Sequence, residues 1–211
     1  MIEKRSIPQV IEAWPTPIAQ YFLNRDITDK EKEAALELTQ ELQRNEGNSH
    51  SVTVEVLEHP DMADIKSFCL ESVKSFCKHI LNIVDTVEPF ITISWINITE
   101  KGQAHHRHSH PNSIVSGVFY LNANSEVDNI MFYKPEYRRI HYIHGNTTKY
   151  NSDVFQMPVH SGDLLLFDSS VEHSVLPTTG DHIRMSLSFN TFLKGTIGTK
   201  QTLTYLDLTG E

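Results

Sequence analysis

The sequence predicts a mainly β fold, an antiparallel jelly roll, with helices in its N-terminal part. Helical periodicity is confined to residues 1–88 of the 211-residue chain. From residue 89 onward, short segments rich in β-branched and aromatic residues alternate with turn-forming residues. No helical pattern separates these segments, which favours an antiparallel sandwich or barrel. The length suits a single domain, residues 1–211, with a helical support region (1–88) and a jelly-roll core (89–211).

Two helices are expected in the N-terminal region, after an extended entry segment at Ala13–Pro17. Thr28 and Glu31 have the spacing of a capping box, which predicts a helix that runs through about Arg44. Its apolar positions are Ala34, Ala35, Leu38 and Leu42. A second helix is expected after Pro60, because apolar residues recur there at three- and four-residue spacing. They form one core-facing stripe: Met62, Ile65, Phe68, Cys69, Val73, Phe76, Cys77, Ile80 and Leu81.

The segments after residue 89 predict seven strands. They are Phe90–Ile98, Ile114–Leu121, Asn129–Tyr133, Asp153–Pro158, Asp163–Asp168, Glu172–Leu176 and His182–Leu193. The last strand has two different faces: Ile183, Met185, Leu187 and Phe189 on one, and Arg184, Ser186, Ser188 and Asn190 on the other. This alternation fits a half-exposed strand, and it equally fits a strand whose polar row faces a cavity. Residues 134–153 form a long polar insertion, which is typical of a lid or binding loop.

Composition and charge argue against several classes of function. The formal charge of −9 speaks against a nucleic-acid partner, because phosphate binding needs a basic face. The one basic cluster, Lys134, Arg138 and Arg139, is interpreted as a solvated loop. No stretch approaches the roughly 18 apolar residues of a membrane helix, and the N-terminus lacks a signal-peptide pattern.

The two cysteines, Cys69 and Cys77, are predicted to be reduced. Their spacing in the second helix separates them by roughly 12 Å, at about 1.5 Å per residue. That distance is too long for a disulfide. They therefore indicate a reducing compartment, and we expect a cytoplasmic protein.

Four histidines lie within six residues, at His105, His106, His108 and His110. Part of this run should be extended, so imidazoles two residues apart would share a face. His173 lies in a later strand-like segment and could supply a further ligand. Neutral imidazole is a common ligand of borderline first-row metals, so the pattern predicts a mononuclear metal site. The alternative interpretation is a solvated histidine-rich turn.

Arg184 and Ser186 share the polar face of the last predicted strand. There they could donate together to one carboxylate, the guanidinium through its fork and the hydroxyl through a further hydrogen bond. We therefore expect the metal site to hold an anionic co-substrate.

These segments resemble the Fe(II)- and 2-oxoglutarate-dependent dioxygenases, and within them a bacterial and phage branch of 2OG-Fe(II) oxygenases. The likeness covers most of the chain through pieces that follow in order: Trp14–Ile18, Trp95–Asn97, His108–Leu121, Gly162–Val175 and Arg184–Asn190. It implies a double-stranded β-helix with helices packed on one sheet and a metal near the mouth of the barrel. It also implies a hydroxylase that uses Fe(II) and O2 and takes 2-oxoglutarate as co-substrate.

The resemblance assigns a role to each matching residue. His108 and His173 correspond to the two histidine ligands of the metal. Arg184 and Ser186 correspond to the Arg-x-Ser pair that binds the distal carboxylate of 2-oxoglutarate. Two further residues are expected to line the same pocket: Tyr120 and Asn97.

Position 110 departs from the family pattern. The family places Asp or Glu two residues after the first histidine, where this chain has His110. The simplest assignment makes His110 the third ligand, which gives an all-histidine site without protein charge. Two other assignments stay open: His106 with His108 as the pair, or a carboxylate such as Asp168 as the third ligand.

Two other classes of protein are compatible with the histidine pattern. Gly102 followed by His108 and His110 matches the start of a cupin metal motif, but the later Glu and Pro-x-Gly elements are missing. The cupin interpretation also leaves Arg184 and Ser186 without a role. The third class is a non-catalytic jelly-roll binding or virion protein that holds structural zinc or nothing. For the enzyme, analogy suggests a small molecule or a peptide side chain, such as a prolyl residue, as substrate.

Overall fold

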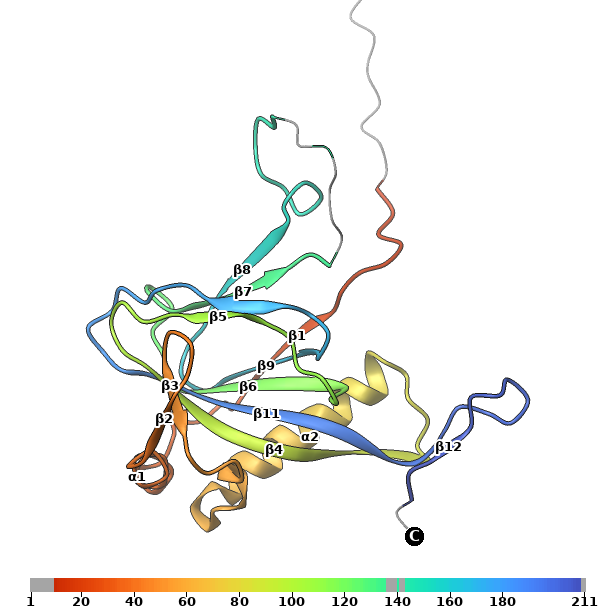
Figure 1. Cartoon of the computed structure of the whole chain (residues 1–211), viewed down its shortest axis with the longest axis horizontal. Helices are drawn as coiled ribbons and strands as arrows, with labels where there is room; N and C mark the ends of the chain where they lie inside the picture. The colour runs from red at the N-terminus through yellow and green to blue at the C-terminus, as the bar shows by residue number, and fades with distance from the viewer. Residues whose placement is uncertain (1–9, 136–139, 141–142, 210–211) are drawn as a thin grey trace, which may run out of the picture.

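The computed structural model describes residues 10–135, 140 and 143–209, which form two antiparallel sheets and two α-helices (Figure 1). The larger sheet has eight strands, in the order β1 (Ile18–Phe22), β9 (Asp163–Asp168), β6 (Val115–Asn122), β11 (Arg184–Ile197), β4 (Val87–Thr99), β3 (Ser49–Ser51) and β2 (Leu42–Arg44), with β12 (Leu206–Asp207) paired to β11. The smaller sheet has the order β5 (His105–His108), β10 (His173–Val175), β7 (Asn129–Tyr133) and β8 (Val154–Pro158). The predicted mainly β jelly roll is confirmed.

All seven predicted strands are present, and β7 and β9 match their predicted bounds to the residue. The sequence analysis missed β1, β2, β3 and β12. β1 follows the extended entry segment and pairs with β9, so that Ile18 lies opposite Phe167. These missed strands are short, and each is defined by its pairing partner more than by its own pattern.

Both faces of the larger sheet are covered. On one face, α2 (Ala63–His79) packs against β4, β6 and β9, and the rings of Phe68 and Phe119 meet edge to face at 6.0 Å. On the other face, Tyr120 and Phe167 pack in a second apolar cluster with Phe132 of the smaller sheet. The helix packing agrees with the fold that the family resemblance implies.

Because both faces of the larger sheet are covered, Arg184, Ser186 and Ser188 of β11 are buried on whichever face they point to. Leu187 and Phe189 are fully buried in the cluster shared with α2. Because successive strand residues point to opposite faces, Arg184 and Ser186 point into the space between the sheets. They are only 2% and 6% exposed. The half-exposed interpretation of this strand is therefore wrong, because Arg184, Ser186 and Ser188 are buried.

The first helix, α1 (Asp29–Glu37), begins as predicted but ends early. Thr28 and Glu31 form the expected capping box through reciprocal side-chain and backbone hydrogen bonds. The prediction that the helix continues to about Arg44 is wrong, because the following residues pair as β2 with β3. Leu42 consequently lies on a strand and is 44% exposed, outside the core.

The second helix, α2, carries the predicted stripe after a 3-10 turn at Pro60–Met62. Its buried stripe residues are Ile65, Cys69, Val73, Phe76 and Cys77. The helix ends at His79, so Ile80 is 48% exposed and its predicted place in the core is wrong. Both cysteines are free, as expected. No helix in the described part of the chain is long and apolar enough to span a membrane.

The described residues of the insertion, 134–135, 140 and 143–153, extend the hairpin of β7 and β8 into a projecting arm (Figure 1). Its base is closed by a hydrogen bond from the Lys134 N–H to the Asp153 carbonyl, at 2.9 Å. Arg138 and Arg139 of the predicted basic cluster lie outside the described residues.

Candidate metal and co-substrate site

Three histidines meet at one end of the smaller sheet. The antiparallel register of β5 and β10 places His108 directly opposite His173, with ring centroids 4.4 Å apart. His110 follows β5, where its N–H donates to the Ser169 carbonyl at 2.9 Å. Its ring lies 4.9 Å from that of His108 and 5.2 Å from that of His173. One ring nitrogen from each histidine lies within 4.8 Å of the other two, so the three predicted ligands converge.

Backbone carbonyls orient two of these rings. Nδ1 of His108 lies 2.8 Å from the carbonyl oxygen of His106, and Nδ1 of His173 lies 3.1 Å from that of Val171. A ring nitrogen facing a carbonyl oxygen must carry the proton, so in the neutral ring Nε2 holds the lone pair. This hydrogen bond from the distal nitrogen is typical of metal-binding histidines.

Burial keeps these imidazoles neutral. It lowers the pKa of His173 to about 3 and that of His110 to about 4, with a further contribution from the neighbouring His108 ring. Burial also lowers the pKa of His108. A buried cation near other titratable rings is unfavourable, so the proton is lost and the lone pairs are available at neutral pH.

The guanidinium of Arg184 lies between the sheets without a carboxylate partner among the described residues. Its Nη1 donates to the Asn129 carbonyl at 3.3 Å, and its centre lies 5.3 Å from the ring centroid of Tyr120. Its Nε has no hydrogen-bond partner there, and neither does the Tyr120 hydroxyl. Buried polar groups are normally satisfied, so these two orphaned atoms indicate a polar ligand.

Three predicted pocket residues form one row across the larger sheet. Ser186 on β11 lies opposite Tyr120 on β6 and opposite Asn97 on β4. The amide nitrogen of Asn97 donates to the Ser188 hydroxyl at 3.0 Å, whereas its Oδ1 has no partner in the described part of the chain. Burial raises the pKa of Tyr120 to about 12, so its hydroxyl stays protonated and can donate. A buried cation with nearby hydroxyl and amide groups fits a dicarboxylate such as 2-oxoglutarate.

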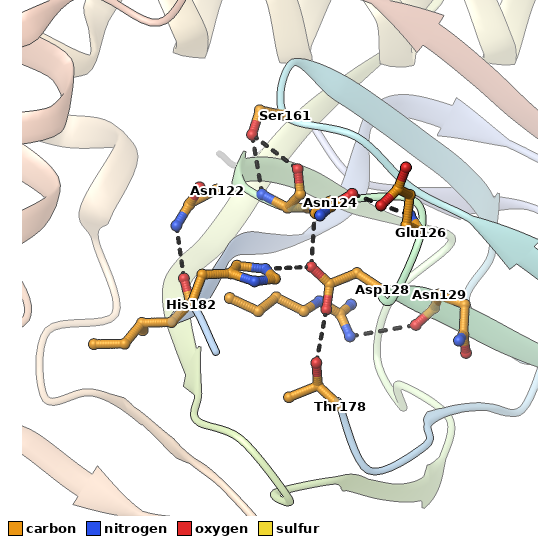
Figure 2. Close-up of polar contacts among 11 residues, drawn as sticks. Asn122, Asn124, Glu126, Asp128, Asn129, Ser161, Thr178 and His182 are labelled. Carbon is orange, nitrogen blue, oxygen red and sulfur yellow. Dashed lines mark hydrogen bonds and ion pairs between the residues drawn. The ribbon is translucent and has the colours of Figure 1, made fainter. Parts of the chain in front are cut away.

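A polar cluster surrounds the buried carboxylate of Asp128 (Figure 2). That carboxylate has three partners: the Thr178 hydroxyl at 3.0 Å, the Asn124 N–H at 2.9 Å and Nε2 of His182 at 2.7 Å. The next residue, Asn129, presents its carbonyl to Arg184. The sequence analysis did not single out Asp128, because two of its partners lie 50 and 54 residues away and no local pattern marks them.

The two alternative assignments of the third ligand differ in their geometry. Oδ1 of Asp168 accepts from the backbone and the hydroxyl of Ser170. The groups of possible metal ligands in the described residues contain histidines only. His106, by contrast, does lie near His108, in a second group completed by His105. The geometry therefore leaves His106 as an alternative ligand, whereas Asp168 belongs to no candidate metal group in the described residues.

The structure thus combines a jelly roll, three converging histidines at one sheet and a buried arginine on the other, which fits an oxygenase that uses a metal and an organic acid. Residues 93–190 match the family model described as "Putative 2OG-Fe(II) oxygenase". Over these residues the chain is similar to the Fe(II)- and 2-oxoglutarate-dependent oxygenases. A comparison with curated protein sequences finds no match.

Solved structures share the fold at low sequence identity. An oxidoreductase of the 2OG-Fe(II) oxygenase family from Burkholderia pseudomallei is 13% identical, with a TM-score of 0.57 and coverage of 82% of this chain and 83% of that one. A prolyl hydroxylase from Trichoplax adhaerens, in complex with a peptide fragment, is 17% identical, with a TM-score of 0.58 and 83% coverage of both chains. The epimerase SnoN from nogalamycin biosynthesis is 11% identical, with a TM-score of 0.62 and coverage of 93% and 89%.

Proposed function

We propose that the protein is an Fe(II)- and 2-oxoglutarate-dependent oxygenase with O2 as the oxidant. In this proposal His108, His110 and His173 bind Fe(II), and Arg184 and Ser186 bind the distal carboxylate of 2-oxoglutarate. The observation that carries the proposal is the buried guanidinium of Arg184, whose Nε lacks a partner among the described residues, on the sheet that faces the three imidazoles. Fe(II), when bound, supplies the activation of O2. The net reaction is hydroxylation: one oxygen atom enters a substrate C–H bond, and the other enters the succinate formed as 2-oxoglutarate loses CO2.

The protein groups position the co-substrate and set the charge of the site. Arg184 offers a bidentate fork, and the protonated Tyr120 hydroxyl and Asn97 amide can complete the hydrogen bonds of the pocket. Three neutral imidazoles leave Fe(II) with dianionic 2-oxoglutarate near neutral. With the usual carboxylate ligand the same assembly would be negative, so His110 should change redox tuning and metal preference.

The rival classes fit the geometry less well. A cupin interpretation gives no role to Arg184, which has no carboxylate partner in the described residues, or to the polar row that continues through Ser186. A structural zinc site is normally closed and four-coordinate. The group of His108, His110 and His173 has three protein ligands, which leaves positions open for other ligands. Both observations support the enzyme.

We propose a peptide segment, such as one that contains a prolyl residue, as the substrate. A cavity of about 580 Å³ lies between the N-terminal segment 10–16 and the arm, and Phe132 in its lining is 6.3 Å from the His173 ring. Much of its lining is apolar or aromatic, including Trp14 and Phe155. Its charged lining residues have partners, as in the ion pair of Glu12 and Lys149. Such a groove suits an uncharged extended chain better than a charged metabolite.

We further propose that residues 1–211 act as one domain in a reducing, cytoplasmic setting. The packing of α2 on the strands that carry Arg184 and Tyr120 supports a single functional unit. The two buried, free cysteines support the compartment.

Anaerobic titration of Fe(II) and 2-oxoglutarate, followed by absorption spectroscopy, tests the site. The wild-type protein should develop a weak visible charge-transfer band only when both are present. His110→Ala should lose most of this band at equal Fe(II), whereas His110→Asp should retain it by restoring a carboxylate ligand. His79→Ala, at the end of α2, is the control and should behave as wild type. If His110→Ala keeps the full band while His106→Ala loses it, the ligand assignment is wrong.

A further inference from the structure

Two imidazoles, those of His105 and His106, lie against His108 without a part in the proposed catalytic site. The ring of His105 stacks on that of His108 with centroids 4.5 Å apart, and the ring of His106 lies 4.9 Å from it. One nitrogen from each of these three rings lies within 4.8 Å of the other two. The smaller sheet therefore presents two overlapping groups of three imidazoles that share His108.

His105 offers a nitrogen lone pair to this second group. Its Nε2 lies 3.1 Å from the amide nitrogen of Asn45, whose Oδ1 is engaged by the Glu46 N–H. The Asn45 amide nitrogen must therefore donate, and Nε2 of His105 presents a lone pair that a metal could take over.

His106 supplies a second observation that points to a metal ligand, independent of the His105 contact. Its Nδ1 is buried and has no hydrogen-bond partner among the described residues. An unsatisfied buried nitrogen is unfavourable in proteins, and ligation of a metal ion would satisfy it. The His105 bond to Asn45 and the orphaned His106 nitrogen thus point to the same kind of ligand.

We propose that His105, His106 and His108 form a second metal site for a late first-row divalent ion such as Zn(II), and that its occupation excludes Fe(II) from the catalytic group. His108 donates Nδ1–H to the His106 carbonyl, so only Nε2 can bind metal, and it can bind one ion at a time. The second site itself rests on its own three rings. The exclusion of Fe(II) also rests on the proposed function.

The donor set favours an inhibitory ion over iron. Nitrogen sites bind Cu(II), Ni(II) and Zn(II) more tightly than Fe(II). Neither histidine group contains a carboxylate that would offset this order in the described residues. A late divalent ion in the second site would hold His108 away from Fe(II) and reduce iron occupancy without touching His110 or His173.

The double variant His110→Ala/His173→Ala tests the second site, because it removes two catalytic ligands and leaves the second group intact. Equilibrium dialysis against Zn(II), with elemental analysis, should find one ion per folded chain. Adding His106→Ala should weaken Zn(II) binding at least tenfold, whereas adding His79→Ala should not change it. The proposal fails if the folded double variant binds no Zn(II) at tenfold molar excess, or if His106→Ala has no effect on its binding.

The sharing of His108 needs a separate measurement on otherwise intact protein. His105→Ala/His106→Ala should keep the Fe(II)–2-oxoglutarate band, and at least tenfold more Zn(II) should be needed to halve it than in wild type. Equal Zn(II) sensitivity, or two tightly bound Zn(II) ions per wild-type chain, would contradict the exclusion. Absence of the band in wild type would contradict the proposed function instead, and the dialysis result would stand by itself.

Discussion

Arg184 is the side chain for which the structure predicts the largest effect on co-substrate binding. Its guanidinium is buried and unpaired by any carboxylate in the described residues, so an anion restores the missing interaction. Charge-assisted hydrogen bonds contribute about 1.5–3 kcal/mol each. Arg184→Ala should therefore raise the Kd of 2-oxoglutarate at least tenfold, since about 1.4 kcal/mol corresponds to a factor of ten. Calorimetry on Mn(II)-loaded protein measures this Kd in wild type and in the variant.

A matched control separates this effect from a general loss of charge. Arg44→Ala removes an exposed arginine on β2 and should leave the Kd of 2-oxoglutarate unchanged. Arg184→Lys keeps the charge but loses the fork, and it should fall between wild type and Arg184→Ala. An Arg184→Ala variant with wild-type affinity would remove the co-substrate anchor from the proposed site.

The buried histidines make the metal-free protein sensitive to acid. His173 has its pKa lowered to about 3 in the folded state, whereas the unfolded chain titrates near 6.5. The unfolded state therefore binds protons first, and the stability contributed by neutral His173 is lost as pH falls from about 6.5 toward 3. At pH 5.5, one unit below the unfolded pKa, protonation of this histidine in the unfolded state lowers the free energy of unfolding by roughly 1 kcal/mol.

Urea midpoints at pH 7.5 and 5.5 measure this dependence. The wild-type protein should lose stability between the two pH values, and His173→Gln should lose less, because it removes the titrating group. His160→Gln is a suitable control, since His160 is largely exposed and lies outside the metal group. An equal loss in wild type and His173→Gln would contradict the burial argument.

At the scale of elements, the contact between β6 and β11 depends on one missing side chain. Gly117 lies opposite Phe189 in the register, and a Cβ atom at position 117 would lie 2.1 Å from the Phe189 ring. Phe189 is fully buried in the apolar cluster that it shares with α2. Gly117→Ala should therefore cost about 1–3 kcal/mol, as overpacked core positions do. Because Phe189 shares β11 with Arg184, 2-oxoglutarate affinity should fall as well.

Thermal unfolding measures this prediction. For a chain of this size, about 1 kcal/mol corresponds to roughly 2–4 °C in Tm. Gly145→Ala is the matched control, because a Cβ there meets nothing within 4 Å and its Tm should stay near that of wild type. An unchanged Tm in Gly117→Ala would mean that β6 and β11 can separate without cost.

Elements also show where local sequence pattern succeeds and where it fails. The bounds of β7 and β9 and the buried stripe of α2 were predictable, because periodicity within each segment encodes them. The early end of α1 was not, because β2 forms only by pairing with β3, which in turn pairs with β4. Pairing across the sheet outweighed the helical preference of residues 38–44.

For the whole molecule, the two sheets should be coupled through the ligand. The proposed metal group lies on the smaller sheet, whereas Arg184 lies on the larger one. A ligand that binds only the folded state stabilises it by about 2.7 kcal/mol at 100 times its Kd. Mn(II) with 2-oxoglutarate should therefore raise Tm by roughly 5–10 °C in wild type.

The same thermal shift should depend on both sheets. In Arg184→Ala, adding 2-oxoglutarate to Mn(II) should give little further increase in Tm. In His173→Ala, the combined shift should be small, because the metal that completes the 2-oxoglutarate site is lost. A full shift in either variant would show that the ligand is bound by one sheet alone.

The sequence by itself determined the two helices, the seven predicted strands and the free cysteines, and it singled out the candidate ligands. His108, His173 and Arg184 could be singled out because residue spacing and a family resemblance mark them. Only the tertiary structure decided that His108 lies opposite His173, that Arg184 points between the sheets and that Asp128 accepts a hydrogen bond from Thr178. These facts depend on strand register and on the covering of both sheet faces, which join residues far apart in the chain and leave no periodic signal within any one segment.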